Sequence, residues 1–159
     1  MKTVIVYYSM SGNTEWVARQ LAERLGARTL RLEPVKAYPD KGFRKFFWGG
    51  KSAVMAEAPA LAPYVFDADV ERVIIGFPVW AGTVTPPIRT FVQENGAALK
   101  GKSIAAFACQ SGSGAEKALD KLTQLLGVEK LDARLVLNDP KDRPNPDNAA
   151  AIDAFCRKL

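Results

Sequence analysis

The sequence predicts an α/β fold, namely a three-layer sandwich around a five-stranded parallel sheet of strand order 2-1-3-4-5. Apolar segments with strand character alternate with amphipathic helical segments along the 159 residues, and such alternation is typical of a parallel sheet covered by helices on both faces. Some of the strands are continuously apolar and others carry an arginine, which separates central strands from edge strands. A chain of this length fits the usual domain size of ~100–200 residues, so we expect residues 1–159 to form a single domain.

The expected elements follow from apolar periodicity and from helix-capping signals. We expect strands at 2–8, 28–33, 70–77, 103–109 and 131–137, and helices at 13–25, 85–95, 114–126 and 146–158. Capping signals mark three helix starts: Thr85 before Pro86, Asn145 before Pro146, and Ser113 with Glu116 as a capping box.

The strand order follows from where charge interrupts the strands. The first, third and fourth strands contain uncharged runs, at residues 4–8, 73–77 and 104–108, whereas Arg31 and Arg134 interrupt the second and fifth. A central parallel strand is buried on both faces and excludes charge. The second and fifth strands are therefore predicted at the edges, which gives the order 2-1-3-4-5.

Residues 34–69 form the irregular part of the sequence and are too long for an ordinary connection. We expect a short helix at about 43–57 to supply the crossover to the third strand. The aromatic residues here are interpreted first as packing and second as ligand contacts.

Composition excludes several classes of function. The chain has no histidine, which rules out Ser-His-Asp catalysis and histidine-built metal centres, and we expect no metal site. Cys109 and Cys156 have neither CxxC nor metal-ligand spacing. No apolar run approaches the ~20 residues of a membrane span and no signal-peptide pattern is present, so we expect a cytoplasmic protein without membrane contact. The net charge is +5, but the basic residues are scattered along the chain and form no basic stripe, which argues against nucleic-acid binding.

The segment after the first strand has the composition of an anion site. Between that strand and the following helix lie Ser9, Met10, Ser11, Gly12, Asn13 and Thr14. Free N–H groups, hydroxyls and the positive end of a helix dipole converge in such a turn. The segment has neither the Gly-Lys-Ser/Thr of a P-loop nor a G-x-G-x-x-G, and without lysine or arginine it suits a terminal monophosphate held by neutral donors. A simple capped turn is the alternative interpretation.

Two further segments are expected at the same edge of the sheet, because the carboxyl ends of parallel strands lie together. The third strand leads into Pro78, Val79, Trp80, Ala81, Gly82 and Thr83. We expect the Trp80 indole to be exposed and to stack on a flat ring, with a core tryptophan as the alternative. The fourth strand leads into Cys109, Gln110, Ser111, Gly112 and Gly114, whose mostly small side chains let the backbone approach a ligand.

These segments together resemble the flavodoxin family over essentially the whole chain. Ser9–Thr14 is similar to the family's phosphate-loop pattern (Ser/Thr)-x-(Ser/Thr)-Gly-x-Thr, and Pro78–Thr83 resembles its first flavin-ring loop. The resemblance implies one noncovalently bound flavin mononucleotide (FMN) and an electron-carrier function. It implies phosphate contacts from Ser9–Thr14, ring stacking by Trp80 and a far wall at Cys109–Gly114.

The resemblance also implies a peptide in the ring loop that reorients with the redox state of the flavin. With Ala81 and Gly82 as central residues of a β-turn, flipping their shared peptide would interconvert type I and type II.

Two departures from the family pattern leave other functions open. This chain is basic where electron-carrier flavodoxins are acidic, and it has Gln110-Ser111-Gly112 where they carry an aromatic residue. An FMN-dependent NAD(P)H:quinone or azo-compound reductase is therefore the main alternative, and a non-redox interaction module is a third. A receiver domain is not supported, because such a domain needs an acidic cluster at the strand ends and this chain has none there. A cysteine phosphatase is not supported either, because this chain lacks the arginine that should follow Cys109. We expect a redox partner protein of acidic character, and a monomer or weak dimer.

Overall fold

The sheet consists of five parallel strands in the order β2-β1-β3-β4-β5. The computed structural model describes residues 1–38 and 58–159. The helix expected at 43–57 lies outside the described residues. The strands are β1 (Thr3–Tyr7), β2 (Arg28–Arg31), β3 (Arg72–Pro78), β4 (Ser103–Gln110) and β5 (Arg134–Asn138). The predicted fold class and strand order are thus confirmed.

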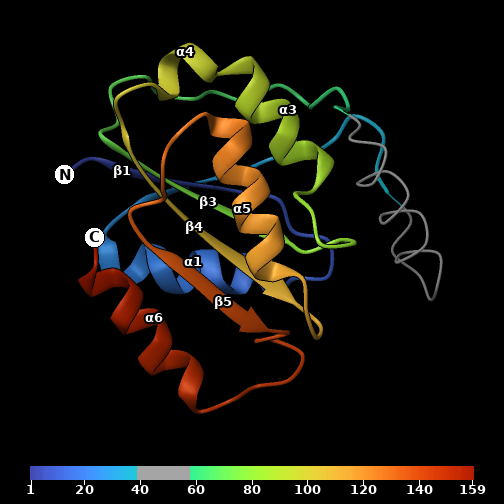
Figure 1. The fold of residues 1–159 in the computed structure, drawn as a ribbon, viewed down its shortest axis with the longest axis vertical. Helices are drawn as coiled ribbons and strands as arrows, with labels where there is room; N and C mark the ends of the chain where they lie inside the picture. Colours follow the sequence, from blue (N-terminus) through green and yellow to red (C-terminus); the bar gives the residue numbers. More distant parts are fainter. Residues whose placement is uncertain (39–57) are drawn as a thin grey trace.

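Helices cover both faces of the sheet, which makes three layers (Figure 1). The helices α1 (Asn13–Leu25) and α6 (Asp147–Arg157) lie on one face, and α3 (Pro86–Glu94), α4 (Gly96–Leu99) and α5 (Ala115–Leu126) lie on the other. The short helix α4 was not predicted. The other helix bounds agree with the sequence-based expectation to within one residue, whereas β5 begins three residues later than expected.

Each strand of the centre contributes to two cores, because successive side chains point to opposite faces. In β1, Ile5 packs with α1 and α6 side chains such as Leu21 and Phe155. Its neighbour Val6 packs with α3 and α5 side chains such as Phe91 and Leu119. The uncharged central strands therefore follow from burial on both faces.

The arginines that marked the edge strands face carboxylates of neighbouring helices. Arg134 of β5 lies 2.8 Å from Asp120 of α5, and Arg31 of β2 lies 3.0 Å from Glu15 of α1. An edge strand leaves room for such a long charged side chain, whereas a central strand does not.

Packing explains why a glycine, Gly76, occupies the middle of β3. It lies opposite Phe107 of β4 in the sheet register, and a Cβ atom added at Gly76 would lie 2.0 Å from the Phe107 ring. Glycine therefore lets a large aromatic side chain pack across the centre of the sheet close to its carboxyl edge.

Candidate functional site

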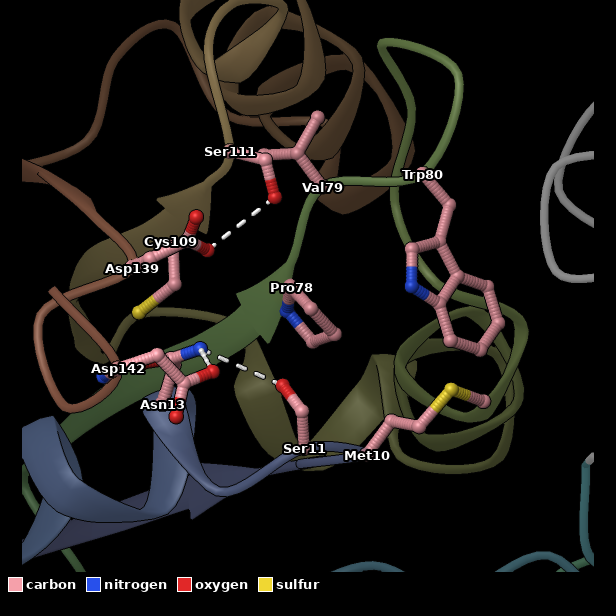
Figure 2. A pocket seen from close by; sticks show the side chains of 10 residues that line it. All are labelled: Met10, Ser11, Asn13, Pro78, Val79, Trp80, Cys109, Ser111, Asp139 and Asp142. Carbon is pink, nitrogen blue, oxygen red and sulfur yellow. Dashed lines mark hydrogen bonds between the residues drawn. The ribbon is translucent and has the colours of Figure 1, made fainter. Parts of the chain in front are cut away.

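A pocket opens at the carboxyl edge of the sheet, where the segments after β1, β3, β4 and β5 meet. Its volume is about 160 Å³, below the ~300 Å³ of a typical small-molecule site, so a larger ligand would extend to the surface. Its lining consists of Met10, Ser11, Asn13, Pro78, Val79, Trp80, Cys109, Ser111, Asp139 and Asp142. Figure 2 shows Trp80 and Met10 on one side and Asn13, Cys109, Asp139 and Asp142 on the other.

The pocket brings together residues from all three segments that the sequence singled out, but not every residue of them. Eight of the predicted site residues line it, namely Met10, Ser11, Asn13, Pro78, Val79, Trp80, Cys109 and Ser111. The others belong to the same segments without lining it: Ser9, Gly12, Thr14, Ala81, Gly82, Thr83, Gln110, Gly112 and Gly114. Gly112 instead borders a neighbouring cavity beside α6.

The segment Ser9–Thr14 is folded around the start of α1. Ser9 is buried, and its hydroxyl oxygen accepts hydrogen bonds from the backbone N–H groups of Gly12 and Glu15, each at 3.2 Å. Gly12 has φ +100°, a left-handed conformation that disfavours other residues. The turn thus presents the N-terminus of α1 toward the pocket edge, which is the geometry of an anion site.

Thr14, in the first turn of α1, carries a polar group that the protein leaves unsatisfied. Its side chain is 1% exposed, and apart from the weak thiol group of Cys109 its hydroxyl has no hydrogen-bond partner among the described residues. A buried hydroxyl without a strong partner is unfavourable. An anion at the helix N-terminus would supply such a partner.

Asn13 has a structural role that the sequence did not reveal. Its amide nitrogen donates to Ser11 Oγ (3.3 Å) and to Asp142 Oδ2 (3.0 Å), and its amide oxygen accepts from the backbone N–H groups of Lys141 (2.9 Å) and Asp142 (3.2 Å). These bonds use both donors and both lone pairs of the amide. The side chain therefore fastens the connection between β5 and α6 to the start of α1.

The Trp80 indole is buried, and the expectation that it is exposed is wrong. Only 8% of Trp80 is exposed, and its ring makes edge-to-face contacts with Tyr8 (centroid distance 5.8 Å) and Tyr38 (5.4 Å). The residues beside Trp80 in sequence offered little apolar surface, but these tyrosines come from other segments. The indole nevertheless borders the pocket, opposite the carboxylates (Figure 2).

The turn after Trp80 differs from the expected type. Ala81 has φ +50° and Gly82 has φ +66°, and the Thr83 N–H donates to the Trp80 carbonyl oxygen at 3.0 Å. Positive φ at both central residues defines a type I′ turn. The expected type I or type II turn, with positive φ at Gly82 at most, is therefore corrected.

The segment after β4 packs tightly against this turn. A Cβ atom added at Gly114, which has φ +97°, would lie 3.1 Å from Gly82 Cα and 3.3 Å from Val79. Gly114 occupies the N-cap position of α5, and the Gln110 side-chain oxygen accepts from the Ala115 N–H at 2.9 Å. The predicted capping box of Ser113 and Glu116 is therefore wrong, because the Gln110 side chain accepts the hydrogen bond from the first backbone N–H of α5.

The other two capping signals lie at helix starts that the structure contains. Thr85 is the N-cap of α3, although its hydroxyl makes no capping bond. The N-cap of α6 is Pro146, one residue after the predicted Asn145, although Asn145 Oδ1 accepts from the N–H of Asp147, the first residue of the helix, at 2.8 Å.

Cys109 lines the pocket as a protonated thiol. Burial raises the pKa of Cys109 to about 12, and the nearby Thr14 hydroxyl only partly opposes that effect. A thiol with so high a pKa is a poor nucleophile at neutral pH. Cys109 therefore contributes packing and shape to the pocket.

The segment after β5 is the part of the site that the sequence analysis missed. Asp139 and Asp142 line the pocket, and Asp139 accepts from the Ser111 hydroxyl at 3.2 Å. Lys141, between them, lies over the N-terminus of α1, since a Cβ atom at Gly12 would be 2.8 Å from its Nζ atom. The loop that follows each strand of a parallel sheet lies at the carboxyl edge of that sheet. The same rule, applied to the fifth predicted strand, would have placed these residues at the site.

Residues 1–38 and 58–159 include no helix that is long and apolar enough to cross a membrane. The same residues contain no group of three or more acidic or cysteine side chains arranged to hold a metal ion.

Solved structures with the same fold are numerous. A flavoprotein from Lactobacillus acidophilus NCFM, solved in complex with FMN, aligns with a TM-score of 0.74 at 17% identity, covering 98% of each chain. A structure from Bacteroides eggerthii aligns at 0.76 and 22% identity, covering 98% of this chain and 96% of the other. A WrbA-like flavodoxin from Agrobacterium tumefaciens aligns at 0.61 and 15% identity, covering 99% of each chain.

At these identities the structural matches show the fold alone, and the family rests on sequence. A family model described as flavodoxin matches residues 2–145. The match contains the phosphate-loop segment, the Trp80 turn, the segment after β4 and the start of the connection between β5 and α6. The chain therefore belongs to the flavodoxin family.

Proposed function

We propose that this protein binds one FMN noncovalently at the carboxyl edge of its sheet and transfers electrons between redox partners. The observation that carries the proposal is the pocket itself, which joins an anion-binding helix start containing the unsatisfied Thr14 hydroxyl to an apolar side formed by Trp80 and Met10. A flavin with a terminal phosphate has matching chemistry. The Lactobacillus acidophilus flavoprotein of the same fold was solved with FMN, which supports this choice.

The residues that line and border the pocket fit FMN. The N–H groups and hydroxyls of Ser9–Thr14 would hold the phosphate, because a helix N-terminus and neutral donors stabilise an anion there. Trp80 and Met10 would contact the ring, and the segment Cys109–Gly114 would form the other wall. FMN supplies reversible reduction, and the protein binds it, orients it and limits the access of water.

Binding is tested by titrating purified protein with FMN and with riboflavin. FMN fluorescence should be quenched, and riboflavin should bind about two decades more weakly, because it lacks the charge-assisted hydrogen bonds of the phosphate at ~1.5–3 kcal/mol each. Saturating FMN should also raise the melting temperature, since a ligand that binds only the folded state stabilises it by about 2.7 kcal/mol at a concentration of 100 Kd. Equal affinity for both flavins would contradict the phosphate assignment, and no binding of either would leave a non-redox interaction module.

A reductase is the second candidate, favoured by the wall formed after β4. Ser111, Gly112 and Ser113 are exposed and carry no aromatic side chain that could cover a bound ring. That opening would admit a quinone or azo compound as well as a protein partner. Steady-state assays with NADH or NADPH and a quinone, together with the number of electrons taken up per step in a reductive titration, separate an enzyme from a carrier.

A further inference from the structure

The connection between β5 and α6 places a lysine beside the loop proposed to bind phosphate. Asn13 fixes this connection, because its Oδ1 atom accepts hydrogen bonds from the backbone N–H groups of Lys141 and Asp142 at 2.9 and 3.2 Å. Because Asn13 begins α1 and is 5% exposed, the tether holds Lys141 at the helix N-terminus although the two residues lie 128 positions apart in sequence.

Gly12 allows the lysine side chain to lie directly on the loop. A Cβ atom at Gly12 would be 2.8 Å from Lys141 Nζ, 3.2 Å from its Cδ and 3.4 Å from its Cε. The absence of a side chain at this position thus has two effects, since glycine permits φ +100° and also leaves space for the lysine.

Three carboxylates, one in α1 and two in the connection between β5 and α6, have partners other than Lys141. Glu15 pairs with Arg19 and Arg31, Asp139 pairs with Arg143, and Asp142 accepts from the Asn13 amide. Lys141 itself forms no ion pair with any carboxylate in the described part of the chain. Its charge therefore remains available to an anion.

We propose that Lys141 binds the terminal phosphate monoester of the ligand and determines its preference over the unphosphorylated form. The loop Ser9–Thr14 contains no lysine or arginine, whereas a phosphate monoester carries about −1.5 to −2 charges at neutral pH. The neutral donors and the helix dipole orient the phosphate, and Lys141 supplies the opposing charge from a distant part of the chain. The unsatisfied hydroxyl of buried Thr14 is a second, independent indication of an anion at this helix start. The inference rests on the proposed FMN function.

The test compares flavin affinities of the wild type, Lys141→Gln, Lys141→Arg and Lys130→Gln by quenching of flavin fluorescence. Lys130 is exposed and precedes β5, at the opposite end of that strand from Lys141, so its substitution changes the net charge equally without touching the loop. Lys141→Gln should weaken FMN binding by about 3- to 10-fold, the range for one solvent-exposed charge-assisted contact, and leave riboflavin binding unchanged. Lys141→Arg should retain most of the FMN affinity, and Lys130→Gln should resemble the wild type.

Two controls make the result specific to the phosphate. The loss in Lys141→Gln should shrink at high salt, where exposed charges are screened, and inorganic phosphate should compete with FMN less well in this variant than in the wild type. Circular dichroism and thermal melting establish that each variant is folded.

The outcomes separate this inference from the function on which it rests. If Lys141→Gln weakens FMN and riboflavin equally, or if Lys130→Gln has the same effect on FMN, Lys141 is not a phosphate ligand although the protein binds flavin. If the wild type binds neither flavin, the proposed function fails and this inference fails with it.

Discussion

Ala81 adopts a backbone conformation that residues with a Cβ atom rarely use. Its φ of +50° places it in the left-handed region, at a cost of roughly 1–2 kcal/mol for an L-residue. The surrounding contacts hold it there, since the Thr83 N–H bonds to the Trp80 carbonyl and Gly114 packs against Gly82. The strain lies at the edge of the pocket, in the turn that follows Trp80.

Replacing Ala81 by asparagine should therefore stabilise the protein. Asparagine followed by glycine is the preferred pair in a type I′ turn, so Ala81→Asn should gain about 0.5–1 kcal/mol in the free energy of unfolding. Ala81→Val should lose about 1–2 kcal/mol, because a branched side chain is disfavoured at positive φ. Ala81 is exposed, so core packing does not complicate either variant. Urea unfolding without flavin measures both, and two unchanged variants would mean that the turn is not type I′ in solution.

The sequence could predict which residues lie at the site but not what each side chain contacts there. Ser9 to Thr14 was found because its pattern is local, a run of hydroxyls and glycine between a strand and a helix. Trp80 was misjudged because its apolar contacts, Tyr8 and Tyr38, come from other segments. The tether from Asn13 to residues 141 and 142 is equally nonlocal.

At the scale of elements, the start of α5 shows how a side chain can replace an expected cap. Gln110 ends β4, and its Oε1 atom accepts from the backbone N–H of Ala115, the first residue of α5. A glycine at the N-cap has no side chain to satisfy the helix N–H groups. The strand before the loop therefore provides the cap, and a motif confined to residues next to the helix start, such as Ser113 with Glu116, could not indicate this.

A matched pair of alanine substitutions distinguishes these two descriptions of the helix start. Gln110→Ala should lower the free energy of unfolding by about 0.5–2 kcal/mol, the usual cost of removing a cap. Ser113→Ala should change it by less than about 0.5 kcal/mol, because Ser113 is exposed and makes no hydrogen bond within the described residues. Thermal or urea unfolding of the flavin-free protein is the measurement. A larger loss for Ser113→Ala would restore the capping box.

At the scale of the whole molecule, the fold was the most predictable property. A central strand is buried on both faces along its whole length and therefore excludes charge. The composition of the strands thus indicates their order, with uncharged runs in β1, β3 and β4 and arginines in β2 and β5. The site was less predictable because a pocket depends on how loops from distant segments meet. The carboxylates of Asp139 and Asp142 illustrate this, since they give an acidic side to the pocket of a basic protein.

The net charge of +5 predicts how this protein should meet redox partners. We propose that its physiological partner is acidic, because long-range attraction between opposite charges raises association rates. Electron transfer between the flavin-loaded protein and a small acidic iron–sulfur protein should therefore slow as salt increases from ~0.01 to ~1 M, over which the screening length falls from about 30 to about 3 Å. A small basic haem protein is the control, and its rate should rise over the same range as repulsion is screened. Stopped-flow measurement of the second-order rate constants tests both. Rates that do not depend on salt for either protein would show that local charges, such as the carboxylates at the pocket, outweigh the net charge in the encounter.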